Sequence, residues 1–291
     1  MDVLLPRTLD EALEQKAANP RAVPINGGTD VMVEINFGRS RPETIIDVSG
    51  LEELRQADRD DGYWVLGAGT TYTDVIRRLS EVKPLVEASR SVGSPQIRNR
   101  GTVGGNLGTA SPAGDALPVL AAFDAEVMVA SRKGRRSVRW NEFLMGPKKT
   151  SIAPDELILA TRWKRVRGSG SFSKIGTRNA MVISLVGFCL VMDEDSRRVR
   201  VALGSVAPTI VRATEGEDFI SQVLEETGAW ADPSRPIPET ARDEFATRVA
   251  KSARPIDDVR GTAVYRTHAC KVLARRSLSW ALDDRKLDKW S

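Results

Sequence analysis

Two stretches of the chain combine closely spaced glycines with small polar residues. The first contains Gly27, Gly28, Thr29 and Asp30 and precedes an amphipathic run. Glycine lets main-chain N–H groups reach a ligand, and a following helix adds unpaired amides and the positive end of its dipole. This chemistry suits a phosphate group. A tight strand-to-helix turn capped by Thr29 or Asp30 is the structural alternative, and the Gly-Gly pair alone favours it.

The second stretch runs from Gly101 to Pro118 and reads GTVGGNLGTASPAGDALP. Its glycines alternate with threonine, asparagine and serine, and Asp115 precedes an apolar helix-like run. Such a loop offers backbone donors and hydroxyls to a diphosphate and a sugar, while the carboxylate suits a ribityl or ribose hydroxyl. A connecting loop of this length and polarity is uncommon without a function. Two glycine loops together therefore predict a long dinucleotide between two subdomains.

A third glycine segment, from Gly67 to Tyr72, follows a strand-like run and precedes a helix-like one. This is the setting of the Rossmann fingerprint, but Tyr72 stands where the third glycine is required for close packing of helix on strand. The segment does not support an NAD site. The sequence also contains neither a Walker A loop nor a nucleophile elbow.

The predicted secondary structure around these loops changes along the chain from alternating helices and strands to antiparallel strands and then to helices. The first part alternates helix and strand, which predicts a small parallel sheet, and Thr71 with Asp74 resembles a capping box. The segment 125–163 favours short antiparallel strands. Three strand-like runs after residue 167 predict an antiparallel meander, followed by helices at 238–253 and 262–282. We expect a boundary near residue 167.

The composition argues against a membrane protein and against a nucleic-acid-binding protein. Of the 291 residues, 41% are hydrophobic and 28% charged, and no apolar run is long enough to cross a bilayer, so we expect a cytoplasmic protein without membrane insertion. The net charge is only +4, and the basic run 131–140 predicts a solvated hairpin more than a nucleic-acid site.

The residues that usually bind metals or perform acid–base catalysis are scarce. Cys189 and Cys270 are isolated from each other, and His268 is the single histidine. Neither a metal site nor an iron–sulfur cluster can be assembled from them, and we expect no catalytic side chain. Any cluster must belong to a partner.

The ordered motifs resemble those of a known family. INGGTDVMVE and GTVGGNLGTASPAGDALP resemble the two FAD-binding signatures of the flavoprotein, or medium, subunits of molybdenum hydroxylases, the xanthine dehydrogenase and carbon monoxide dehydrogenase family. FSKIGTRNAMVISLVG, VRVALGSVAPTIVRA and DDVRGTAVYRTHACKVL resemble its later landmarks. The resemblance covers nearly the whole chain in the expected order.

The resemblance implies a mixed α/β (α+β) fold. Residues 1–167 would form a two-subdomain p-cresol methylhydroxylase-type FAD-binding domain, with subdomains at about 1–55 and 56–167. Residues 168–291 would form a C-terminal domain with a three-stranded antiparallel sheet plus helices, similar to that of the carbon monoxide dehydrogenase flavoprotein.

The resemblance also implies a set of cofactor-binding residues. The first loop would hold the diphosphate, the second loop would add further contacts, Asp115 would bind a cofactor hydroxyl, and two further residues would lie beside the flavin or adenine. The full set is Ile25, Asn26, Gly27, Gly28, Thr29, Asp30, Gly101, Thr102, Gly105, Asn106, Thr109, Asp115, Ile158 and Lys174. Many relatives have small residues in place of Ile25 and Asn26. His268 is remote from both loops, which favours non-covalent FAD.

By the same resemblance, the chain is an electron-transfer subunit. A molybdenum-binding large subunit would oxidise the substrate, and a small subunit would pass electrons through [2Fe–2S] clusters to FAD, which would reduce NAD or another acceptor. A dimer of heterotrimers is the implied assembly. The two isolated cysteines cannot hold the additional cluster that the 4-hydroxybenzoyl-CoA reductase branch has in this subunit, which argues against that branch.

Two alternatives from other classes stay open. A stand-alone FAD-dependent oxidase or dehydrogenase would turn over an organic substrate without partners, and a non-enzymatic module would bind nucleic acid through the basic hairpin. The sequence of this chain does not identify the substrate of the complex: xanthine, carbon monoxide, an N-heterocycle and an aldehyde are all compatible with it.

Overall fold

A computed structural model describes residues 1–287 and divides the chain into two compact units. The first unit contains residues 1–80, 92–111 and 124–164. The second contains residues 81–91, 112–123 and those from 165 onward. These units are groups of residues in mutual contact, so segments 81–91 and 112–123 belong to the second unit although they precede residue 165 in the chain. The domain boundary expected near residue 167 divides the chain in sequence order, and it stays a prediction.

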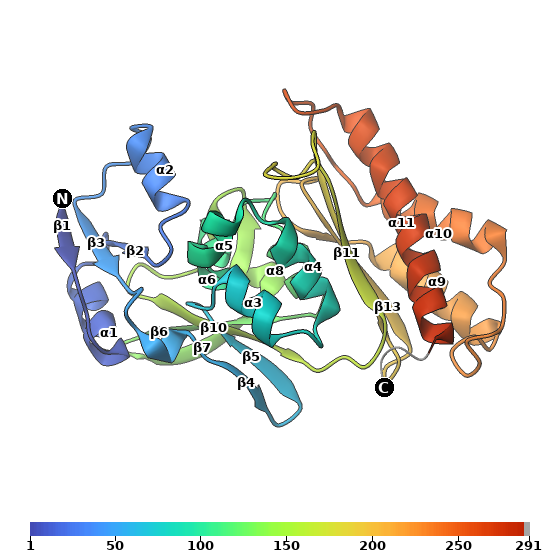
Figure 1. The fold of residues 1–291 in the computed structure, drawn as a ribbon, viewed down its shortest axis with the longest axis horizontal. Helices are drawn as coiled ribbons and strands as arrows, with labels where there is room; N and C mark the ends of the chain where they lie inside the picture. The colour runs from blue at the N-terminus through green and yellow to red at the C-terminus, as the bar shows by residue number, and fades with distance from the viewer. Residues whose placement is uncertain (288–291) are drawn as a thin grey trace. The chain divides into compact units, whose positions relative to one another are not determined.

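The first unit is built on two sheets (Figure 1). One is the expected parallel sheet, in the order β1-β3-β2, and the other is antiparallel, in the order β4-β5-β10-β6-β7. The strands of the parallel sheet are β1 (Asp2–Leu4), β2 (Val23–Ile25) and β3 (Thr44–Asp47). Those of the antiparallel sheet are β4 (Ala57–Asp60), β5 (Tyr63–Gly67), β6 (Glu126–Ser131), β7 (Gly134–Arg139) and β10 (Leu157–Lys164). A hairpin of β8 (Leu144–Gly146) and β9 (Lys149–Thr150) completes the set.

The helices of the first unit are short because glycine, proline and polar residues interrupt their apolar periods. They are α1 (Leu9–Ala18), α2 (Val31–Asn36), η1 (Glu52–Leu54), α3 (Tyr72–Arg78), α5 (Pro95–Arg100), α6 (Val103–Thr109) and α8 (Trp140–Phe143). The capping residues expected from the sequence act at α3, where the Thr71 hydroxyl accepts a hydrogen bond from the amide of Asp74 at 3.1 Å. The core lies under α1, where Ala12 and Ile46 are fully buried.

The second unit is a sheet between two layers of helices. The sheet has the order β11-β12-β13-β14, so the predicted three-stranded antiparallel meander is confirmed and has an additional short strand at its edge. The strands are β11 (Gly170–Ile175), β12 (Val186–Asp193), β13 (Arg198–Gly204) and β14 (Val211–Arg212). The helices are α4 (Lys83–Ser91), α7 (Ala116–Ala122), α9 (Thr214–Glu226), α10 (Glu239–Lys251) and α11 (Ala263–Lys286).

Burial along β12 follows from this layering. Helices α9 and α11 contact β13 and β12, α10 packs against both helices, and α4 and α7 contact strands of the same sheet. Figure 1 shows α9, α10 and α11 beside β13. Every residue of β12 is buried, because both faces of the strand are covered. Phe188 and Phe245 are fully buried in the resulting core. Within residues 1–287, no helix is long and apolar enough to cross a bilayer.

Candidate functional site

The first glycine loop follows the carboxyl end of β2. The carbonyl of Ile25 accepts a hydrogen bond from the amide of Val48 at 2.9 Å, which holds the end of β2 beside β3. Gly28 has φ of +72°, a conformation that other residues rarely adopt. Within the described part of the chain, the amides of Gly27, Gly28 and Thr29 donate no hydrogen bond. Their donors are therefore available to a ligand or to water.

The two glycine loops are in direct contact. A Cβ on Gly27 would lie 1.8 Å from the carbonyl oxygen of Arg100, so only glycine fits there. The Thr109 hydroxyl donates a 2.7 Å hydrogen bond to Asp30. Asp30 makes no side-chain cap for α2, so it links the loops rather than closing a turn. The structure thus brings together residues of both predicted loops, which lie far apart in the sequence.

Part of the second loop has a structural role. Thr102 is buried and caps α6, accepting a hydrogen bond from the amide of Gly105 at 3.0 Å. A Cβ on Gly104 would lie 2.4 Å from the Cβ of Ala68, so the glycine allows close packing on the strand end. Gly101 is buried and donates its amide to Ile97. These contacts explain a polar cap and two glycines without any ligand.

Two other glycines of the same loop have no such packing reason. A Cβ on Gly105 would meet only the hydroxyl of Thr102, at 3.1 Å, and one on Gly108 would meet only the Ile158 side chain, at 3.6 Å. Both glycines are exposed. Beside them, the buried side-chain oxygen of Asn106 has no hydrogen-bond partner among the described residues. Exposed backbone next to an unsatisfied polar atom fits a polar ligand that approaches closely.

Ile158, in β10, lies next to this surface, since its Cδ1 approaches Gly108. The ladder between β10 and β6 shifts register between Ile158 and Ala160, which marks a bulge at this point. Sequence motifs around Ile158 were weak, but the structure brings its side chain to the second loop.

The segment from Gly67 to Tyr72 has a different environment. A Cβ on Gly67 would lie 2.3 Å from the carbonyl oxygen of Leu54, and one on Gly69 would lie 3.0 Å from the same atom. Tyr72 is buried at the start of α3. These glycines accommodate the chain's own backbone, in agreement with the rejection of a Rossmann site there.

Asp115 and Lys174 form a buried ion pair in the second unit. The Lys174 ammonium lies 2.6 Å from a carboxylate oxygen of Asp115 and also donates to the carbonyl of Ser91. The Ser91 hydroxyl donates to the same carboxylate at 2.9 Å. Burial raises the pKa of Asp115, while the hydrogen bonds and the charge of Lys174 oppose that rise. The second carboxylate oxygen is buried and has no partner among the described residues.

Ser91 could not have been found from the sequence, because it carries no motif of its own and lies far from both partners along the chain. The Lys174 ammonium donates hydrogen bonds to Asp115 Oδ2 and to the carbonyl of Ser91. The other carboxylate oxygen of Asp115, Oδ1, remains able to accept a hydrogen bond.

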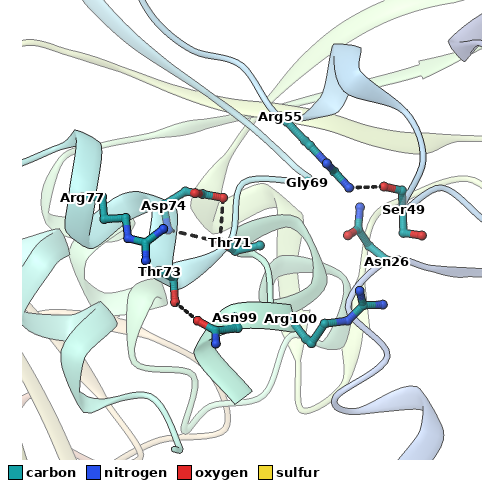
Figure 2. A pocket seen from close by; sticks show the side chains of 10 residues that line it. All are labelled: Asn26, Ser49, Arg55, Gly69, Thr71, Thr73, Asp74, Arg77, Asn99 and Arg100. Carbon is teal, nitrogen blue, oxygen red and sulfur yellow. Dashed lines mark hydrogen bonds between the residues drawn. The ribbon is translucent and has the colours of Figure 1, made fainter. Parts of the chain in front are cut away.

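A cavity of about 380 Å³ lies beside Asn26 in the first unit (Figure 2). Residues from four segments line it: Asn26; Ser49 and Arg55; Gly69, Thr71, Thr73, Asp74 and Arg77; and Asn99 and Arg100. The arginines were not predicted as site residues. The only sequence signal was the position of Arg100 immediately before Gly101.

The cysteines lie in the core of the second unit. Both are buried and form no disulfide, and burial raises the pKa of Cys270 to about 12 and that of Cys189 even further. Neither thiol can become a thiolate ligand at ordinary pH without unfolding of the core. His268 is exposed on α11.

Comparisons with known proteins identify the family of this chain. Residues 1–162 match the family described as the FAD binding domain in molybdopterin dehydrogenase, and residues 171–281 match the CO dehydrogenase flavoprotein C-terminal domain. The chain is 30% identical to the xanthine dehydrogenase FAD-binding subunit of Escherichia coli O157:H7 over 286 residues, covering 94% of each. It is 27% identical to the carbon monoxide dehydrogenase medium chain of Hydrogenophaga pseudoflava, covering 88% of each.

The fold has solved counterparts. A chain of quinoline 2-oxidoreductase from Pseudomonas putida 86 superposes with a TM-score of 0.86 at 22% identity, covering 97% of both chains. That likeness establishes the fold, and the predicted mixed α/β class is confirmed. Because a family match spans more than half of the chain and a relative at 30% identity spans 94% of it, the chain belongs to the FAD-binding subunits of the molybdenum hydroxylase family.

Proposed function

We propose that this chain is the electron-transfer subunit of a heteromeric molybdenum hydroxylase of the xanthine dehydrogenase or carbon monoxide dehydrogenase type. It receives electrons from a [2Fe–2S] subunit and delivers them to NAD or another acceptor. Bound FAD supplies the reversible redox centre, and the chain supplies binding and orientation. The observation that carries the proposal is the pair of glycine loops in contact, with free amides on one and exposed backbone on the other.

The two loops divide the work of binding the cofactor. The amides of Gly27, Gly28 and Thr29 are donors for phosphate oxygens, and glycine at positions 27 and 28 removes side chains that would keep an anion away. Gly105 and Gly108 leave the second loop uncovered beside Asn106. The hydrogen bond between Thr109 and Asp30 holds these two surfaces in register.

Asp115 and Lys174 have separate roles in the proposal. The unpartnered oxygen of Asp115 accepts a hydroxyl of the cofactor, while Lys174 keeps the buried carboxylate ionised and oriented. Both cysteine thiols are buried in the core of the second unit, and His268 belongs to α11, outside both glycine loops in the sequence, which supports a cofactor held without a covalent bond.

The partners of the proposed complex follow from the names of the relatives. These include FAD-binding and medium subunits, such as the nicotine 6-hydroxylase medium subunit of Paenarthrobacter nicotinovorans. We assign the molybdenum cofactor to a large subunit and the [2Fe–2S] clusters to a small subunit, in a dimer of heterotrimers. Burial of Cys189 and Cys270 supports the placement of the clusters on a partner.

The deciding experiment begins with the visible absorption spectrum of the purified chain, followed by identification of the cofactor released on heating. Stoichiometric FAD supports the proposal, and copurification of large and small subunits from the native source then tests the assembly. Absence of flavin after incubation with added FAD would refute the cofactor assignment. Turnover of an organic substrate by the chain alone would replace the subunit function with that of a stand-alone oxidase.

A further inference from the structure

The cavity beside Asn26 is rich in hydrogen-bond donors. Two of its acceptors are already occupied by neighbouring hydroxyls (Figure 2). Thr71 donates to the carboxylate of Asp74 at 2.7 Å, and Thr73 donates to the side-chain oxygen of Asn99 at 2.6 Å. The polar groups left for a ligand are therefore mostly donors.

The charges of the lining are also unbalanced. Arg55, Arg77 and Arg100 line the cavity, while Asp74 is the only carboxylate among the lining residues that the structure describes. Arg55 pairs with Glu52 outside the lining and donates to the carbonyl of Ser49. Arg77 and Arg100 make no ion pair with any residue in the range 1–287. Two uncompensated guanidinium groups thus come from different helices to one cavity.

We propose that this cavity binds a phosphate-bearing small molecule at a site beside the FAD loops, which shares Asn26 with the first loop. Guanidinium groups recognise phosphate oxygens through paired charge-assisted hydrogen bonds, and three arginines around one carboxylate favour a multiply charged anion. Asn26 follows β2 and Ser49 follows β3, so the cavity lies at the carboxyl ends of two parallel strands, where α/β sheets bind ligands. Gly105 and Gly108, which are open to the cofactor, do not line it.

The site adjoins the place where the loops meet. Arg100 presents its side chain to the cavity and its carbonyl to Gly27, and Asn26 immediately precedes that glycine. An anion that fixes Arg100 and Asn26 therefore also restrains the contact between the loops. If the proposed FAD function holds, binding at the two sites is thermodynamically coupled, and each ligand tightens the other.

Pyrophosphate is the probe for the test. Isothermal titration calorimetry would measure its binding to the full chain saturated with FAD, while flavin absorbance reports whether FAD is released. We expect one pyrophosphate per chain with FAD retained. Arg77→Gln and Arg100→Gln should each weaken binding about tenfold or more, the loss of a charge-assisted contact. Arg78→Gln is the matched control, because Arg78 is the next residue of α3 and does not line the cavity.

Each result decides the proposal. Binding to the FAD-saturated chain that weakens in both arginine variants and not in the control supports it. Displacement of FAD by pyrophosphate, or binding only to chain without FAD, would show that the cavity belongs to the cofactor site and overturn it. No binding, or equal binding by all variants, would also overturn it. If the chain takes up no FAD at all, the proposed function fails, and titration of the flavin-free chain still tests the cavity.

Discussion

Replacement of Gly105 by alanine should weaken FAD binding while leaving the stability of the fold nearly unchanged. The added Cβ would meet one protein atom, the Thr102 hydroxyl at 3.1 Å, and Gly105 does not have a positive φ. Alanine in place of glycine in a helix is worth about 0.5–1 kcal/mol in favour of folding. The tight contact with Thr102 opposes this gain. We therefore expect the free energy of unfolding of the flavin-free chain to change by no more than about 1 kcal/mol.

The expected effect on FAD binding has the opposite sign. If the cofactor lies against the exposed backbone at Gly105, the new methyl group displaces it and breaks at least one hydrogen bond to a charged group. Such a bond contributes about 1.5–3 kcal/mol, which corresponds to a dissociation constant about 10- to 150-fold higher. Quenching of flavin fluorescence in a titration with FAD-free chain measures this constant, and urea denaturation measures stability.

Gly50→Ala is the matched control, because a Cβ at Gly50 meets no atom within 4 Å and the residue lies outside both loops. Its FAD dissociation constant should equal that of the unchanged chain. If Gly105→Ala binds FAD as tightly as the control while its fold is intact, the backbone of the second loop does not contact the cofactor and the assignment is wrong.

The other predictions concern strain, the buried ion pair and the thiols. Gly28→Val puts a β-branched residue at φ of +72°, which costs about 1–3 kcal/mol, so flavin content and unfolding free energy should both fall. Lys174→Met leaves the carboxylate of Asp115 buried without its cation, and we expect a loss of about 3–5 kcal/mol near neutral pH, measured by urea denaturation. A thiol reagent should modify neither Cys189 nor Cys270 in the folded chain at mildly alkaline pH and both after denaturation.

The Lys174→Met prediction has a definite dependence on pH. Burial raises the pKa of Asp115 in the folded state, so the protonated carboxyl is tolerated and the ionised one is penalised. In the unfolded chain Asp115 ionises at its ordinary pKa. The penalty therefore appears as the pH rises through that value and is complete above the folded-state pKa. The stability deficit of the variant should shrink on acidification, and a second substitution, Asp115→Asn, should remove most of it. A deficit that is independent of pH would contradict the ion-pair explanation.

Local features of the fold were predictable because their causes are local. The Thr71 and Asp74 pair predicted the start of α3, and alternation after residue 167 predicted the antiparallel meander. The additional strand β14 was missed because two residues carry too little periodicity to be distinguished from a loop. Its pairing with β13 depends on tertiary contact, which a single sequence does not report.

The candidate site was predictable as two loops but not as an arrangement of side chains. Glycine spacing indicated where the backbone must be approached, and the structure brings the two loops together through Gly27 and Arg100. Nothing in the sequence indicated that Ser91 would join Asp115 and Lys174, because these residues come from three separate elements. Long-range polar networks of this kind require knowledge of the fold.

The glycines show why sequence alone cannot separate structure from function at this site. Gly104 and Gly105 are adjacent and identical in type, yet a Cβ on the first would collide with Ala68, whereas a Cβ on the second would meet only the Thr102 hydroxyl, at 3.1 Å. The first glycine is required by packing, so its replacement damages the fold whether or not a cofactor binds. At the second, the protein opposes a methyl group only through the Thr102 hydroxyl, so a large loss of FAD binding with an intact fold must come from what binds. Only the second position can therefore test the cofactor site independently of the fold.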